Sequence, residues 1–80
     1  MRVEIYSLKR VVFEGEASEA NCKTAMGEIT VLDHHEPLIS LLQEGPIAIT
    51  AADGTAHHFP VKGGFLEVKP ENLARFIVDE

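Results

Sequence analysis

Short stretches of apolar and β-branched residues, separated by turn residues about every eight to ten positions, make up most of the chain. Near its start, Val3 and Ile5 alternate with Glu4 and Tyr6, which is the period of a half-buried strand. No segment sustains the apolar spacing of a helix. The pattern therefore predicts a small all-β sandwich or barrel.

Turn residues mark where the expected strands end. Asp53-Gly54 is the strongest hairpin signal, because both residues tolerate the positive φ of a type I′ turn. Pro60 cannot donate a ladder hydrogen bond, so the return strand 57–61 is expected at a sheet edge or beside a bulge. Gly15 predicts a bulge or a close backbone approach. The other expected strands cover residues 3–6, 11–16, 18–23, 28–32, 37–42, 65–69 and 73–78, and alternation also resumes at Ile47 and Ile49.

Length, composition and charge narrow the functions that such a fold can perform. Eighty residues, 45% hydrophobic and 25% charged, are expected to form one domain over residues 1–80. The formal net charge of −6 argues against a nucleic-acid partner, because nucleic-acid binding draws on a basic surface. No apolar run approaches the roughly 18 residues of a membrane span, and no basic lipid-docking helix is present. Membrane association is therefore expected only through another protein.

The residue types that most often carry chemistry do not assemble into a recognisable site. His34-His35 and His57-His58 are adjacent pairs, and neighbours on a strand point to opposite faces, so we expect no metal site. Cys22 has no partner for a disulfide, which fits a reducing, cytoplasmic compartment, and is expected to be a small buried apolar residue. Gly63-Gly64 lacks the Lys and Ser/Thr of a phosphate loop and indicates a bulge or tight turn. No catalytic residue and no cofactor are predicted.

The apolar residues suggest binding to another protein. A domain of this size buries only about 60% of its unfolded surface, so it is marginal by itself. The stretch 37–42, Phe65 and Phe76 offer apolar side chains beyond what a minimal core needs. From the residues alone, the chain is a soluble all-β interaction module.

Several segments resemble the epsilon subunit of the rotary F-type ATP synthase. Residues 27–39, which read GEITVLDHHEPLI, are similar to that family's Gly-Glu-apolar-Gly strand, Pro-Gly-His-Ala-Pro corner and following apolar pair. The double-glycine segment 61–68 (VKGGFLEV), the Gly45-Pro46-Ile47 break and the opening stretch 11–16 also fit that family. The similarity covers nearly all eighty residues in the right order, which is more specific than any one motif.

The resemblance implies a β-sandwich of about ten short, mostly antiparallel strands, the N-terminal domain of epsilon. It further implies a non-catalytic subunit at the foot of the central stalk, which binds the gamma subunit and the polar loops of the c-ring. Such a subunit couples the flow of protons or sodium ions to ATP synthesis. It would lie at the cytoplasmic face of the bacterial inner membrane, held there by the complex.

The resemblance also assigns roles to individual residues. Gly27, Glu28 and Ile29 match the segment that touches the c-ring, where a carboxylate can meet basic loop residues. The gamma contact falls on the corner and apolar stretch at His35, Pro37, Leu38, Leu41 and Leu42. For each leucine the alternative is a place in the sandwich core, because strand residues alternate between faces.

The chain departs from the family pattern at several positions. Thr30 replaces a glycine, Asp33-His34 replaces Pro-Gly, Glu36 replaces a small residue and Lys62 replaces a serine. These changes predict a bulkier, more charged and less rigid corner. The family's C-terminal helical hairpin has no counterpart before Glu80, so we expect either a short-form subunit or a fragment.

Two other classes of protein remain open. Biotinyl and lipoyl carrier domains are sandwiches of similar size, but they need a lysine at a hairpin tip. Here the clearest tip is Asp53-Gly54, and neither Lys23 nor Lys62 lies in a carrier-like setting. A small enzyme would need catalytic groups from a partner, because the chain itself shows no such motif.

Overall fold

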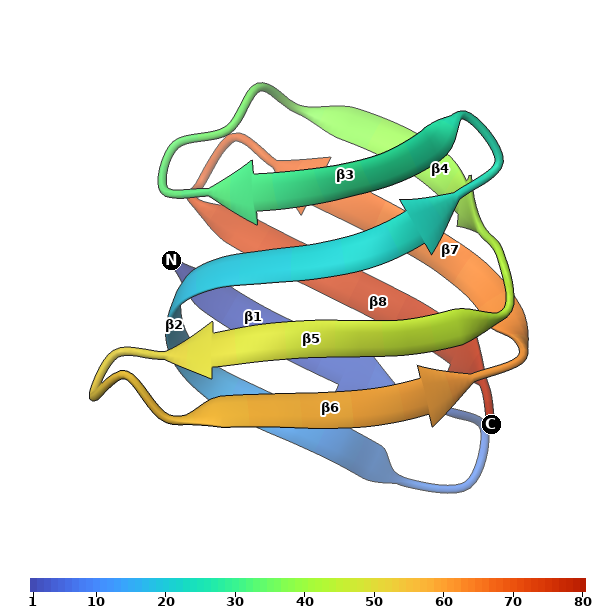
Figure 1. Cartoon of the computed structure of the whole chain (residues 1–80). Helices are drawn as coiled ribbons and strands as arrows, with labels where there is room; N and C mark the ends of the chain where they lie inside the picture. The colour runs from blue at the N-terminus through green and yellow to red at the C-terminus, as the bar shows by residue number, and fades with distance from the viewer.

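Eight strands and no helix make up the computed structural model, which describes all 80 residues (Figure 1). The strands are β1 (Arg2–Tyr6), β2 (Val11–Thr24), β3 (Gly27–Leu32), β4 (Leu38–Leu42), β5 (Gly45–Ala51), β6 (Ala56–Val61), β7 (Gly63–Lys69) and β8 (Leu73–Asp79). The prediction of an all-β fold is confirmed, although the strand count is eight rather than about ten. The structure holds no helix that is long and apolar enough to cross a membrane.

The strands form two facing layers, as Figure 1 shows. One layer, here called the front layer, contains β3, the second half of β2, β5 and β6. The other, here called the back layer, contains β4, β7, β8 and β1. All pairings are antiparallel except that of β1 with β8, so the mostly antiparallel expectation is confirmed.

Strand β2 belongs to both layers. Its first half pairs with β1, where Glu16 lies opposite Arg2, and its second half pairs with β3 and β5. The register with β5 shifts between Ala17 and Glu19, where the strand passes from one layer to the other. The expected strands 11–16 and 18–23 are therefore one strand of 14 residues, which is one reason the count falls short of ten. Gly15 pairs in register with Val3, and the irregularity in the β1–β2 pairing lies instead between Ile5 and Tyr6. The prediction of a bulge at Gly15 was therefore wrong.

The connection between β5 and β6 differs from the predicted turn type, whereas the predicted edge strand is confirmed. Residues Asp53-Gly54 do connect β5 to β6, but only Gly54 has a positive φ, of 89°. Gly54 N–H donates to the Ala51 carbonyl at 2.9 Å, which is the pattern of a longer loop rather than a two-residue type I′ turn. Strand β6, which carries Pro60, pairs only with β5 and is an edge strand, as predicted.

The core lies between the two layers and is built from inward-facing residues of both. Val3 and Ile5 of β1 and Phe76 of β8 are fully buried on one side, and Ile47 and Ile49 of β5 on the other. Cys22 is also buried, as predicted, and burial raises the pKa of its thiol to about 11, with a smaller contribution from the charge of Glu28. The alternation of buried and exposed positions along each strand leaves the outward-facing residues free to form surfaces.

Gly64 allows β7 and β8 to approach closely. Its φ is +137°, and a Cβ at this position would overlap the carbonyl oxygen of Ile77 and lie 2.9 Å from the Cα of Val78. Gly64, rather than the pair, is thus required by strand packing, and both glycines lie within β7, so the tight turn or bulge predicted for Gly63-Gly64 was wrong.

We expect Gly64→Ala to lower the free energy of unfolding by about 3 kcal/mol, because backbone strain adds to steric overlap. Gly54→Ala is the matched control: its φ is also positive but no atom lies within 4 Å of the added Cβ. Its cost should be about 1 kcal/mol. Urea unfolding of both variants measures the difference, and equal effects would contradict the close approach.

Candidate protein-interaction surfaces

The outer face of the back layer carries a continuous line of apolar side chains. Strand pairing places Leu41 opposite Phe65, Phe65 opposite Ile77, Ile77 opposite Tyr6, and Tyr6 opposite Val11. These five residues, here called the apolar row, cross β4, β7, β8, β1 and the first half of β2. Leu41, Phe65, Ile77 and Val11 are 54%, 53%, 45% and 54% exposed. Ile39, 74% exposed, extends the apolar surface along β4.

A line of charged residues runs beside the apolar row on the same face. Pairing aligns Glu67, Arg75, Glu4 and Glu14, here called the charged row. Glu4 is only 9% exposed, and its carboxylate accepts hydrogen bonds from Arg2 Nε at 3.0 Å and from Arg75 Nε at 3.1 Å. These bonds, that of Arg2 first, hold the pKa of the Glu4 carboxyl below its ordinary value despite the partial burial.

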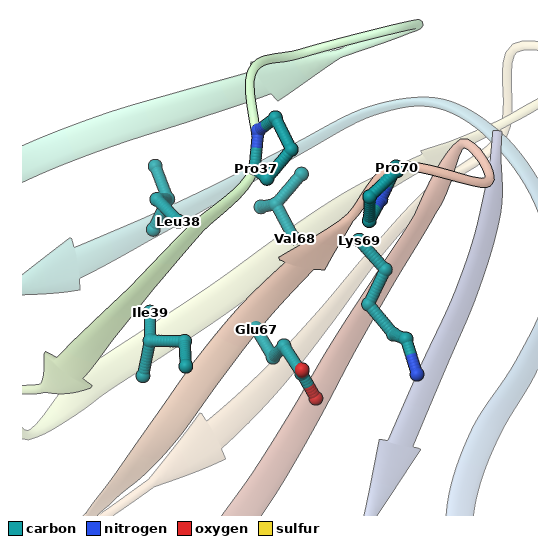
Figure 2. Close-up of a pocket in the computed structure, with 7 residues that line it drawn as sticks. All are labelled: Pro37, Leu38, Ile39, Glu67, Val68, Lys69 and Pro70. Atoms are coloured by element: carbon teal, nitrogen blue, oxygen red, sulfur yellow. The ribbon is translucent and has the colours of Figure 1, made fainter.

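A shallow hollow opens at one end of β4 and β7 (Figure 2). Pro37, Val68 and Pro70 form its apolar part, and the side chains of Glu67 and Lys69 lie at its border. Leu38 and Ile39 also line it. Ile39 lines the hollow and also lies exposed on β4, so the hollow borders the apolar surface there, whereas Val68 and Leu38 line it from the side of the core.

The structure brings together most of the residues predicted to contact gamma. Pro37 and Leu38 line the hollow, and Leu41 lies in the apolar row. His35 lies at the corner before β4, where its ring Nδ1 donates to the Glu36 carbonyl at 2.8 Å. Leu42 is 6% exposed and belongs to the core, and Leu38 is half-buried and packs against the core, which is the alternative that alternation offered for each leucine. Residues Phe65 and Ile77 join this surface only through pairing in the sheet.

The residues predicted to contact the c-ring lie at the start of β3 but do not share one face. Gly27 is exposed with φ of +114°, whereas Ile29 turns inward against the core. Glu28 points to the outer side of the front layer, where its carboxylate accepts a hydrogen bond of 2.9 Å from Asn21 Nδ2. Sequence reasoning missed Met26, which is 90% exposed at the tip of the β2–β3 turn.

The tip of the β2–β3 turn is held in place by a buried hydroxyl. Thr24, 4% exposed, donates from Oγ1 to the Gly27 carbonyl at 2.7 Å and accepts from Met26 N–H at 3.1 Å. These bonds hold the backbone of the turn, from which the Met26 side chain projects into solvent.

The two histidines of β6 have different surroundings. His57 packs with Phe13 and Phe59, with ring centroids 5.8 Å and 6.3 Å away, while His58, its neighbour on β6, is exposed. No three His, Cys, Asp or Glu side chains come together in a group that could hold a metal ion.

Comparison with known proteins decides the family. The family described as "ATP synthase, Delta/Epsilon chain, beta-sandwich domain" matches residues 1–79. The chain belongs to this family. The ATP synthase epsilon chain of Acinetobacter baylyi is 39% identical over 70 residues, which are 88% of this chain and 50% of that protein. The epsilon chain of Xanthomonas euvesicatoria pv. vesicatoria is 35% identical over 79 residues, 99% of this chain and 56% of that protein. The chain thus spans about half the length of these curated relatives.

Solved structures show the same fold. A chain of the Euglena gracilis mitochondrial ATP synthase (OSCP/F1/c-ring) superposes with a TM-score of 0.90 at 20% identity, covering 98% of this chain and 49% of that chain. A chain of the Tetrahymena thermophila mitochondrial ATP synthase (central stalk/c-ring) gives a TM-score of 0.82 at 20% identity, covering 100% and 63%. The resemblance to the epsilon β-sandwich domain is confirmed.

The corner at residues 33–36, which departs from the delta/epsilon pattern, is braced by side chains. His34 adopts a positive φ of 60°, and its N–H donates to Asn72 Oδ1 at 2.8 Å. Asn72, itself at a φ of 59°, also donates from Nδ2 to Asp33 Oδ1 at 3.4 Å, and the Met1 ammonium contacts the same carboxylate. Hydrogen bonds from the β7–β8 turn thus brace this corner.

We expect Asn72→Ala to lower the free energy of unfolding by about 1–2 kcal/mol, because it removes both hydrogen bonds and puts Ala, which tolerates positive φ less well than Asn, at this position. Asn72→Gly removes the same bonds without the backbone strain and should cost less. Urea unfolding distinguishes them. If both variants match the parent protein, the bracing of the corner contributes nothing.

The lowered pKa of Glu4 predicts how the free energy of unfolding changes as the pH falls. Because the folded pKa lies below the unfolded value, Glu4 stabilises the fold above the unfolded pKa, near 4.5, and this contribution is lost as the pH falls through the folded pKa. Glu4→Gln should therefore lose less stability than the parent between pH 7 and pH 3. Glu71→Gln, which removes an exposed carboxylate with no ion pair, is the control and should retain the parent's pH dependence. Urea midpoints at the two pH values give the answer; parallel losses in Glu4→Gln and the parent would contradict it.

Proposed function

We propose that this chain is the β-sandwich part of an epsilon subunit in the central stalk of an F-type ATP synthase. Its role is non-catalytic: it binds the gamma subunit and the c-ring, and so couples ion flow to ATP synthesis. Residues 1–80 act as one domain in this proposal. The single observation that carries it, given the family, is the exposed apolar row on the outer face of the back layer.

The apolar row is suited to a stable protein contact. Leu41, Phe65 and Ile77 lie side by side on three paired strands and remain about half exposed. Contiguous apolar side chains on a rigid sheet contribute binding free energy when a partner removes them from water. The hollow at Pro37 and Leu38 and the corner at His35 extend this surface. We assign the whole face to gamma.

The β2–β3 turn supports a second contact at a distance from the first. Gly27 and Glu28 begin β3, and the outward-facing Glu28 belongs to the front layer rather than the back layer. Asn21 orients the Glu28 carboxylate, which suits it to a basic group on a c-ring loop. Met26 at the tip adds an apolar contact. With the two surfaces on different layers, one molecule can hold gamma and the ring at once.

The location follows from the same partners. Bacterial epsilon chains are among the curated relatives, so we place the chain at the cytoplasmic face of a bacterial inner membrane, attached through the complex. The coupling ion, a proton or sodium ion, is set by other subunits.

Leu41→Asp is the direct test of the gamma surface. The variant places a charge in the apolar row and should weaken binding to the gamma subunit of the same synthase by about 30-fold or more. Isothermal titration calorimetry or light scattering after size-exclusion chromatography measures the complex. Leu32→Asp is a matched control, because Leu32 is also 54% exposed but lies on β3 in the front layer.

Glu28→Lys completes the experiment, since it should leave gamma binding unchanged while weakening attachment to the c-ring in the assembled synthase. Equal losses of gamma binding in Leu41→Asp and Leu32→Asp would contradict the assignment of the back layer. Absence of any complex between the parent chain and gamma at micromolar concentrations would overturn the proposed function.

A further inference from the structure

Arg75 presents hydrogen-bond donors that nothing in the chain uses. Its Nε donates to Glu4 Oε1 at 3.1 Å, but its two Nη groups make no hydrogen bond and no salt bridge. The side chain is 34% exposed, so the free end of the guanidinium reaches the outer surface of the back layer. Glu67 lies directly across on β7 but forms no ion pair with Arg75.

The nearly buried carboxylate of Glu4 fixes the direction of these donors. Its side chain is 12% exposed, and its second oxygen is held by Arg2 Nε at 3.0 Å. Arg2 is engaged further, since its Nη2 lies 3.5 Å from Glu14 Oε2. Of the two guanidinium groups on this face, only that of Arg75 keeps its Nη edge free. A guanidinium held at Nε offers the parallel pair of N–H groups that a carboxylate binds bidentately.

The position of Arg75 links these donors to the apolar row. Arg75 precedes Ile77 by two residues on β8, so both side chains point to the same face, and Phe65 lies beside Ile77 on β7. A partner that covers the apolar row therefore also removes water from the Arg75 Nη groups. Leaving those charged donors without an acceptor would cost binding free energy, so the covering surface needs an oxygen acceptor at this place.

We propose that Arg75 is the charged anchor of this face and binds a carboxylate of the gamma subunit through its two Nη groups. The inference rests on the proposed function, because it takes gamma as the partner of the back layer. It adds the chemistry of recognition: an Asp or Glu side chain on gamma, bordered by apolar residues that meet Phe65 and Ile77. Glu4 is the positioning residue, since it orients Arg75 without touching the partner.

The test compares three variants in binding to gamma by isothermal titration calorimetry. Arg75→Gln should raise Kd by about 30-fold or more, because it removes one member of a desolvated charge pair. Arg75→Lys keeps the charge and can still neutralise Glu4, but it lacks the planar pair of donors and should recover only part of the affinity. Lys62→Gln removes the same charge at the β6–β7 connection, outside the apolar row and the hollow, where Lys62 is exposed and makes no salt bridge, and should change Kd by less than about threefold.

Acidic residues of gamma then identify the acceptor. Among gamma variants with one Asp→Asn or Glu→Gln change, one should weaken binding to the parent chain while having no further effect on binding to Arg75→Gln. Circular dichroism and urea unfolding test whether each variant is folded. If Arg75→Gln does not fold, Arg75→Lys is compared with the parent chain in its place.

The outcomes separate this inference from the proposed function. If Leu41→Asp abolishes binding while Arg75→Gln and Lys62→Gln have equal, small effects, gamma binds this face but Arg75 is not its anchor. Full recovery by Arg75→Lys, or the lack of any coupled acidic residue on gamma, would also overturn the bidentate contact. If Leu41→Asp has no effect on binding, the proposed gamma face itself is wrong.

Discussion

The pairing of β2 with both layers is the constraint on which the rest of the structure depends. Its first half continues the back layer beside β1, and its second half lies between β3 and β5 in the front layer. One strand therefore holds the two layers at a fixed separation, and the core residues fill the space between them. A core of sixteen buried residues is small, so this covalent continuity contributes much of the order that a larger domain would obtain from packing.

This arrangement determines which residues form the outer surfaces. The inward-facing residues of each strand fill the core, so the alternate residues face outward. Along β8, Ala74, Phe76 and Val78 point into the core, which leaves Arg75 and Ile77 on the outside. The same alternation on the neighbouring strands aligns outward residues into one apolar and one charged row. Sheet pairing thus converts isolated exposed residues into an extended face, and the rigidity of the sheet keeps their spacing constant.

Much of the fold could be predicted from local patterns, since alternation locates strands and Pro60 identifies an edge. The sequence could not show that β2 runs unbroken across both layers, because the shift at Ala17 to Glu19 depends on its partner β5. It also missed the type of the β5–β6 turn, which the φ of Gly54 decides. For the candidate site, the resemblance named Leu38, Leu41 and Leu42 alike, whereas in the structure only Leu41 faces outward.

The apolar row and the charged row could not be predicted from the sequence for another reason. Glu4 and Arg75 are 71 positions apart, and they meet only because β1 pairs with β8 in parallel. No local pattern reports such a pairing. The residues that define the outer face come from both ends and the middle of the chain, so they become one surface only after folding.

The burial of Cys22 has a practical consequence. Cys22 is 1% exposed and the pKa of its thiol is raised to about 11, so at neutral pH almost no thiolate is present, and none is accessible, to attack an alkylating reagent while the sandwich is closed. Cys22 lies on β2, the strand that joins the layers. The rate at which it becomes alkylated therefore reports how often the two layers separate, and this natural probe can time the opening of the domain, alone or in complex, without any introduced label.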